Sequence, residues 1–182
     1  MGLIVGLGVG GVILLVMALV IVLVLVNRDT TVGLNEEVEV DGLAFTVTGV
    51  RESPGDPEAT ELRDLMQHDV LTSAHPEEVV IVDLTVRNID SVQRQWDPDA
   101  ELGLYDEGED LTTETTVQES LEARGEYEAA EEVPGEASGV ELAPGESASV
   151  SQAFSHTVSY MHPGQVRITN GPGEPAWVSR SA

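Results

Sequence analysis

Residues 78–88, EVVIVDLTVRN, decide the fold of this chain. In an extended strand, successive side chains point to opposite faces. One face would hold Val80, Val82, Leu84 and Val86, and the other Val79, Ile81, Asp83, Thr85 and Arg87. β-Branched residues dominate the first half and favour a strand over a helix. The stretch therefore predicts a central sheet strand with one face in a core and the other partly covered.

Other alternating runs flank this strand. Residues 37–40 and 43–50 are joined by Asp41-Gly42, a pair typical of a tight hairpin. In the second run, Leu43, Phe45 and Val47, with Gly49 after them, would share one face. Further strands are predicted at residues 100–105, 111–117, 147–154, 165–169 and 176–179. Seven or eight short strands with few helices indicate an all-β antiparallel sandwich over residues 35–182.

Two segments interrupt the strand pattern. Residues 52–77 predict a helical insertion, because Asp56 can cap a helix that has Pro57 at its first position. Its apolar stripe, which should pack against a sheet edge or one end of the core, is Leu62, Leu65, Met66 and Val70. Residues 118–139 are acidic, rich in alanine and broken by Pro134-Gly135, which predicts a mobile acidic loop.

Residues 1–28 predict a single membrane anchor. Residues 2–26 carry no charge, and about 25 helical residues reach roughly 37 Å, enough to cross a hydrocarbon core of about 30 Å. The run has no polar face, no basic segment before it and no cleavage site, which argues against a core helix and a signal peptide. A linker is expected over residues 29–34. Arg28 favours a cytoplasmic domain only weakly.

Glycines recur on one side of the predicted anchor. Gly2, Gly6 and Gly10 stand four positions apart, and small residues at this spacing let two membrane helices approach closely. The spacing predicts a homodimer through the anchor, while the alternative is a glycine-rich helix of the ordinary membrane type.

The chain is strongly acidic. It has 33 Asp and Glu residues, eight arginines, no lysine and a formal charge of −25 at pH 7, with 17 of the acids and one arginine in residues 97–146. This charge repels nucleic acid and anionic lipid headgroups, so neither is an expected partner. It suits a halophilic-type surface that stays soluble in strong salt, or a chain that collects cations.

Motifs of catalysis are missing from the sequence. Without lysine there is no Walker-type phosphate loop or Schiff base, and without cysteine there is no thiol nucleophile, disulfide or thiolate metal ligand. Neither G-x-S-x-G nor H-E-x-x-H occurs. We therefore expect no catalysis and no cofactor.

Two metal sites are alternatives to a plain binding role. Calcium would take oxygen ligands from an acidic turn and hairpin that contain Asp97, Asp99, Asp106, Glu107, Glu109 and Asp110. Copper would suit the imidazoles of His156 and His162 with the thioether of Met161. Neither spacing matches a standard metal motif, and solvated loops explain the same residues.

The order GLAFTVTGV, VVIVDLTVRN, WDPDAELGLYDEGED and LAPGESASVSQAF resembles a widespread extracytoplasmic domain of unknown function. This family is sometimes mislabelled as telomeric-repeat-binding-factor-like. The resemblance covers roughly residues 32–154 and implies an immunoglobulin-like β-sandwich, similar to a small secreted immunoprotective antigen. Members usually follow a lipoprotein signal or one membrane anchor. The resemblance carries over no catalytic residue.

These features together predict a single-pass cell-membrane protein. The resemblance favours a C-terminal domain outside the cell over the weak charge bias of Arg28. The domain should act as a binding or structural module for an unknown extracytoplasmic protein or ligand. A metal-handling domain is the alternative.

Overall fold

The computed structural model describes residues 30–67, 78–106, 109–111, 117, 133, 139–156 and 164–180. Its strands are β1 (Thr30–Gly33), β2 (Glu37–Val40), β3 (Leu43–Glu52), β4 (Glu78–Asn88), β5 (Arg94–Trp96), β6 (Leu102–Asp106), β7 (Glu109–Asp110), β8 (Val140–Leu142), β9 (Ser147–His156), β10 (Gln165–Ile168) and β11 (Ala176–Ser179). Its helices are α2 (Pro57–Gln67) and α3 (Pro98–Glu101).

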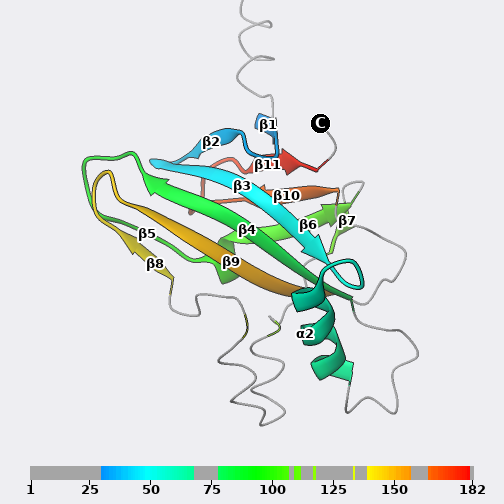
Figure 1. Ribbon diagram of the computed structural model, residues 1–182. Helices are drawn as coiled ribbons and strands as arrows, with labels where there is room; N and C mark the ends of the chain where they lie inside the picture. Colours follow the sequence, from blue (N-terminus) through cyan, green and yellow to red (C-terminus); the bar gives the residue numbers. More distant parts are fainter. Residues whose placement is uncertain are drawn as a thin grey trace, which may run out of the picture.

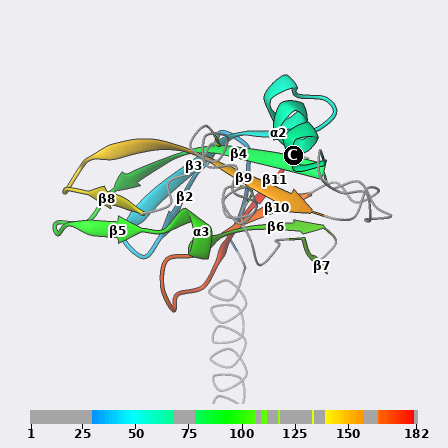
Figure 2. The ribbon, with the colours of Figure 1, turned by 90° about the horizontal axis from the view of Figure 1, so that it is seen from below.

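Two β-sheets packed face to face form the body of the domain (Figure 1). Sheet A has the strand order β1-β11-β10-β6-β7, and sheet B has the order β2-β3-β4-β9. Figure 2 shows the two layers, with β3, β4 and β9 above β10, β6 and β7. A separate two-stranded pairing joins β5 to β8. Among the described strands, only β1 and β11 pair in parallel. The predicted all-β sandwich is confirmed.

The predicted central strand lies inside sheet B. β4 pairs with β3 on one side and with β9 on the other. Four of its side chains enter the core between the sheets, namely Val80, Val82, Leu84 and Val86. Phe45 and Phe154 lie in the same core. The alternation of β4 therefore predicts its buried face correctly.

The β2–β3 hairpin turns where the sequence predicts. Asp41 and Gly42 have φ angles of 41° and 82°, and positive φ at both central residues is typical of the two-residue turns that connect hairpin strands. Later in β3, a bulge shifts the register between Val47 and Gly49. Gly49 therefore opposes Asp83 on the outer face of sheet B, so the prediction that it shares the face of Phe45 is wrong.

Helix α2 begins at the predicted signal. The Asp56 carboxylate accepts hydrogen bonds from the backbone N–H groups of Glu58 and Ala59, at 3.1 and 3.0 Å. This satisfies two of the amide groups that a helix start leaves without partners, and Pro57 stands at the first helical position.

The buried side of α2 covers the outer face of sheet B. Ala59, Leu62 and Met66 form a second apolar cluster with side chains of β4 and β9, namely Val79, Ile81 and Ala153. The helix therefore packs on the face of the sheet rather than at its edge or at one end of the core. This gives Val79 and Ile81 the cover that the sequence predicts, while Leu65 is only partly buried and Val70 lies outside the described residues.

Asn88, the last residue of β4, connects the β4–β5 loop to the β8–β9 turn at the end of the sandwich. It is fully buried, and its amide donates to the carbonyl oxygens of Val92 at 2.8 Å and Leu142 at 2.9 Å. Its side-chain oxygen accepts from the backbone N–H of Asp90 at 2.9 Å. Gly145, with φ of 78°, lies in the turn between β8 and β9 and donates its N–H to the backbone oxygen of Asn88.

Several predicted boundaries are wrong. The expected linker at residues 29–34 contains β1, which pairs with β11 at the other end of the chain. The strand expected at residues 100–105 begins only at Leu102, because α3 takes up Ala100 and Glu101. The strand that returns beside β6 is β7, which ends at Asp110, before the predicted range of 111–117, and residues 112–116 lie outside the described residues. The pairing of β5 with β8 adds two short strands at residues where the sequence predicts none.

The membrane anchor, the glycines of its association face and nearly all of the predicted acidic loop lie outside the described residues. Among the residues that the structure describes, no helix is long and apolar enough to cross a bilayer.

Candidate functional site

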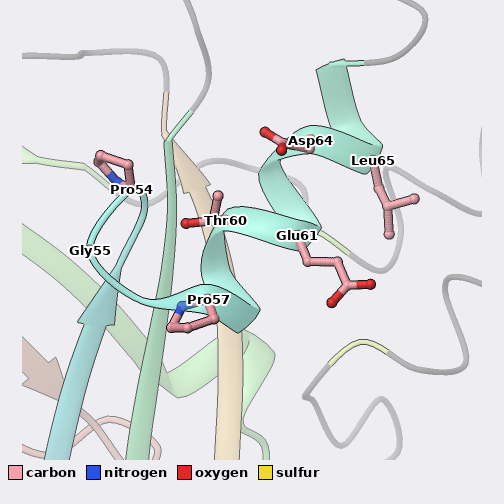
Figure 3. A pocket seen from close by; sticks show the side chains of 7 residues that line it. All are labelled: Pro54, Gly55, Pro57, Thr60, Glu61, Asp64 and Leu65. Atoms are coloured by element: carbon pink, nitrogen blue, oxygen red, sulfur yellow. The ribbon is translucent and has the colours of Figure 1, made fainter.

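An open pocket of about 570 Å³ lies at the start of α2 (Figure 3). Its described lining residues are Pro54, Gly55, Pro57, Thr60, Glu61, Asp64 and Leu65. They come from the loop between β3 and α2 and from the first two turns of the helix. The pocket thus combines proline and leucine surface with two carboxylates and one hydroxyl.

The helical period explains why these side chains are available. Residues three and four apart share a helix face, so the side that buries Ala59, Leu62 and Met66 against sheet B leaves Thr60, Glu61 and Asp64 on the other sides. In Figure 3, Thr60 and Asp64 point to the side of Pro54, whereas Glu61 and Leu65 point to the opposite side. Each side therefore has one carboxylate next to apolar surface, Asp64 on the side of Pro54 and Glu61 on the side of Leu65.

An ion-pair cluster around Arg51 fixes the base of this site. Arg51, near the end of β3, binds Asp83 of β4 through two hydrogen bonds, from Nε at 2.7 Å and from Nη2 at 3.0 Å. Its Nη1 also donates to Asp56 at 3.3 Å and to Glu58 at 2.6 Å. Ser151 of β9 donates to the Asp83 carboxylate at 2.6 Å. One arginine thus connects three strands to the cap and first turn of α2.

The bulge in β3 makes this cluster possible. It places Gly49 directly opposite Asp83, and a Cβ atom at Gly49 would stand 3.2 Å from an Asp83 carboxylate oxygen. Such a distance is tighter than ordinary contact, so glycine leaves the carboxylate the room to face Arg51. The Thr48 hydroxyl donates to the backbone oxygen of Asp83 at 3.2 Å.

The cluster stays charged near neutral pH. The hydrogen bond to Asp83 is the largest influence on Arg51 and raises the pKa of its guanidinium. Burial is the largest influence on Asp83 and acts to raise its pKa, but the hydrogen bonds from Arg51 and Ser151 outweigh it, so the pKa lies below the usual 3.8. Neither group is suited to exchange protons near neutral pH, and the cluster is therefore a structural support.

Backbone contacts hold the loop beside the pocket in place. Ser53 is buried, its N–H donates to the Val79 carbonyl at 3.0 Å, and its hydroxyl accepts from the Val79 N–H at 3.0 Å. The Asp56 N–H donates to the Glu52 carbonyl at 2.7 Å, and the Glu52 carboxylate binds Arg180. The loop is thus tied to both sheets before it enters α2.

The carboxylates of the pocket are open to a ligand. Glu61 is exposed and makes no ion pair with any described residue. Asp64 contacts the neighbouring Arg63 at 2.8 Å, yet its side chain is 63% exposed, and a pair this exposed contributes little to stability. The geometry suits a cationic group with apolar surface beside it.

Comparison with known proteins identifies the family. The profile of the family described as domain of unknown function (DUF4352) matches residues 32–156. The chain belongs to the DUF4352 family. None of the functionally curated proteins matches this DUF4352 chain significantly.

Solved structures resemble the DUF4352 chain at low identity. The yjhA protein of Bacillus subtilis is 13% identical with a TM-score of 0.48, covering 82% of this chain and 99% of that one. The secreted protein MPT63 of Mycobacterium tuberculosis is 14% identical with a TM-score of 0.47, covering 84% and 98%. An uncharacterized β-sandwich protein of Clostridium difficile is 12% identical with a TM-score of 0.40, covering 84% and 94%. Likenesses at this level carry no information about function.

The predicted calcium ligands of the DUF4352 domain lie at two ends of β6. Asp97 caps α3 before the strand and accepts from the Asp99 N–H, and Asp99 accepts from the Gln152 amide at 2.6 Å. Asp106 ends the strand, and Asp110 accepts from the Tyr105 hydroxyl at 2.5 Å. At roughly 3.3 Å per strand residue, the two groups are about 13 Å apart along β6. The fold therefore separates Asp97 and Asp99 from Asp106 and Asp110, and a calcium site in the acidic hairpin stays a prediction because Glu107 lies outside the described residues.

No group of three His, Asp or Glu side chains among the described residues could hold a metal ion together. Glu109 lies in β7 and His156 ends β9, while Glu107, Met161 and His162 lie outside the described residues. The copper site stays a prediction.

A second feature of the DUF4352 domain was missed by sequence reasoning. On the outer face of sheet A, the Arg167 guanidinium lies 5.0 Å from the centre of the Tyr105 ring, and Tyr105 meets Trp177 edge to face at 5.0 Å. Burial, and then the hydrogen bond to Asp110, raises the pKa of Tyr105 to about 12, so the phenol stays protonated and donates. Only the alternation of β10 and β11 gives a signal for this cluster, since Val166, Ile168, Ala176 and Val178 face the core.

Proposed function

We propose that this protein is a membrane-anchored extracytoplasmic binding module of the immunoglobulin-like type, which captures a cationic group of a partner protein at the pocket beside α2. The uncharged run at residues 2–26 supports the anchor. The family resemblance supports the extracytoplasmic location and the immunoglobulin-like topology. The module acts by binding and not by catalysis.

The pocket is the observation that carries the proposed function. Its lining offers apolar contact from Pro54, Pro57 and Leu65 and negative charge from Glu61 and Asp64. The nearest described arginines already have carboxylate partners, since Arg51 binds Asp83 and Arg63 contacts Asp64. The cation must therefore come from another molecule. An arginine or lysine side chain flanked by apolar residues supplies both the charge and the apolar surface.

The loop beside the pocket is held in one conformation before binding, and this favours affinity. Ordering a loop on binding costs free energy, and the contacts of Arg51 and Ser53 have already met that cost during folding. Long-range attraction also helps, because a chain of charge −25 raises the local concentration of a basic partner and its association rate.

A peptide titration with charge-matched variants tests the site. The full chain in phosphatidylcholine nanodiscs is titrated with a fluorescein-labelled peptide of arginine, leucine and proline, and anisotropy gives the Kd. Glu61→Gln with Asp64→Asn should weaken binding about tenfold, equivalent to about 1.4 kcal/mol. The control pair, Glu39→Gln with Glu174→Gln, changes the net charge equally at exposed positions away from the pocket. It should change the Kd less than about twofold, because charges beyond a Debye length of about 8 Å are screened at 0.15 M salt.

Equal weakening by both pairs would show general charge attraction and would refute the pocket as the site. A second peptide with norleucine in place of arginine separates charge from apolar contact. Binding of the norleucine peptide as tight as that of the arginine peptide would refute the cationic specificity.

The chain lacks cysteine, so one introduced thiol reports the orientation without background. Val92 is 54% exposed and suits a Val92→Cys variant. A membrane-impermeant maleimide should label intact cells as fully as lysed cells. Labelling only after lysis would place the domain inside the cell and contradict the extracytoplasmic location.

A further inference from the structure

The outer face of sheet A differs from the rest of this acidic chain. Its strands point Tyr105, Arg167 and Trp177 outward, because their neighbours Leu104, Val166 and Val178 face the core. Cross-strand pairing brings the three together, with Arg167 opposite Trp177 and Gln165 opposite Tyr105. Gly103, opposite Arg167 on the other side, has no side chain, and the guanidinium lies over the Tyr105 ring of the same strand β6.

Arg167 has an unusual position for an arginine in this chain. The other described arginines, at positions 51, 63, 87, 94 and 180, contact carboxylates within 4.0 Å. Arg167 makes no ion pair within the described part of the chain, and its Nε is buried without a hydrogen-bond partner there. Instead the guanidinium stacks over Tyr105. Its charge is therefore not neutralised by a described acid, although the chain holds 33 of them.

Acidic residues are scarce on this face. Asp110 in β7 is the acid that the register places beside Tyr105, and it is hydrogen-bonded to the Tyr105 hydroxyl. The central strands β10 and β11 contain no acidic residue. This face can approach a lipid surface at a much lower electrostatic cost than the acidic side that carries α2.

The fold places this face close to the predicted anchor. The uncharged run ends at Val26, and β1 begins at Thr30. β1 pairs with β11 so that Thr31 lies directly opposite Trp177. Five residues of extended chain span at most about 17 Å, so Trp177 cannot lie far from the membrane boundary. This step rests on the membrane anchor of the proposed function.

We propose that the outer face of sheet A rests on the headgroup layer of the bilayer that holds the anchor. Trp177 has an amphipathic ring of the kind that is enriched at membrane interfaces, while Tyr105, which is only 8% exposed, supports the Arg167 guanidinium. Arg167 offers its guanidinium to a lipid phosphate, a pairing that guanidinium geometry favours. The lipid is zwitterionic, because the net charge of the chain opposes an anionic surface. The pairing of β1 with β11 keeps this face within a few residues of the predicted anchor.

Tryptophan quenching in vesicles tests the contact. The full chain is reconstituted in phosphatidylcholine vesicles with and without lipids brominated near the headgroup end of the acyl chain. Wild type has two tryptophans, and Trp96 is 1% exposed inside the sandwich. Brominated lipid should quench a large share of the wild-type emission, at least about twofold more than in Trp177→Phe, where only Trp96 remains. Arg167→Gln should reduce the quenching of Trp177 because it loses the phosphate contact.

Flotation of the vesicles tests the membrane anchor separately from the contact of sheet A with the bilayer. If the protein floats with the vesicles and wild type is quenched no more than Trp177→Phe, the anchor stands and the membrane contact of sheet A is refuted. If the protein does not float, the anchor itself is refuted, and the contact falls with it.

Discussion

Replacing Asn88 with alanine should lower the free energy of unfolding by about 3 kcal/mol. The change removes three hydrogen bonds and leaves the carbonyls of Val92 and Leu142 and the N–H of Asp90 without their partner. A buried polar group left unsatisfied costs about 1–3 kcal/mol. The bond to Leu142 is fully buried and accounts for about 2 kcal/mol, whereas water replaces part of the other two, which lie nearer the surface.

Urea unfolding of residues 29–182, a fragment that keeps β1 whole, measures this loss. Gln93→Ala is the matched control, because Gln93 is exposed and its bond to Glu141 is a surface contact, so the change should stay within about 0.5 kcal/mol. Asn88→Asp keeps the shape but aims a carboxylate at two carbonyls. That raises the pKa of the new acid, so its destabilisation relative to wild type should shrink as pH falls. A loss below about 1 kcal/mol for Asn88→Ala would refute the role of Asn88 in holding the loops together.

Four further predictions concern the core, the ion pair, the charge and the anchor. Leu84→Ala should cost about 2–5 kcal/mol in the same assay, and a loss under about 1 kcal/mol would contradict its place in the core. Asp83→Asn should cost most at neutral pH. Because the pKa of Asp83 is depressed, its contribution is lost below its usual 3.8, so the difference from wild type must shrink between about pH 5 and pH 3. The melting temperature of residues 29–182 should rise equally in NaCl and KCl up to about 1 M, because salt screens the repulsion between the acids. An equal rise in sucrose at matched osmolality would indicate solute exclusion instead of screening. Gly6→Leu should weaken self-association in a membrane reporter assay, and unchanged association would rule out the glycine face.

The alternation of apolar and polar residues predicts most strands of the sandwich, because each strand has one face buried in the core. A strand between a core and a covered or solvated face must repeat its apolar residues with period two, and β4 does so from Val80 to Val86 and β3 from Leu43 to Val47. Asp41-Gly42 predicts the hairpin for a local reason, since few residue pairs accept positive φ at both positions.

Short elements that depend on distant partners escape such reasoning. β1 has only four residues, and its strand conformation depends on pairing with β11, which lies near the other end of the chain. β5 and β8 have three residues each and stabilise one another across a long gap in sequence. Helix α3 is different, because Asp97-Pro98 repeats the Asp-Pro signal that locates α2 at Asp56-Pro57. Asp97-Pro98 could therefore predict the start of α3, but the apolar alternation of the residues after it favours a longer strand.

The candidate site was predictable only in part. The cap at Asp56 and the stripe of Leu62 and Met66 give the start and the buried side of α2, and hence the side that faces outward. The partnership of Arg51 with Asp83 depends on a one-residue bulge, and no pattern in the sequence announces a bulge at Thr48. The acidic turns predict a calcium site, whereas the fold places Asp97 and Asp99 at the other end of β6 from Asp106 and Asp110.

The distribution of charge along the chain gives the domain two unlike sides. After Glu146 the chain has a single acidic residue, Glu174, and this tail supplies β10 and β11 at the centre of sheet A. The acids of α2 lie over the outer face of sheet B, on the opposite side of the sandwich (Figure 2). If sheet A rests on lipid, the pocket must face away from the membrane, and charge repulsion and aromatic contact then favour the same orientation. An anchored module of this kind would hold its binding site towards approaching basic partners, because β1, which follows the predicted anchor in sequence, pairs with β11 in sheet A.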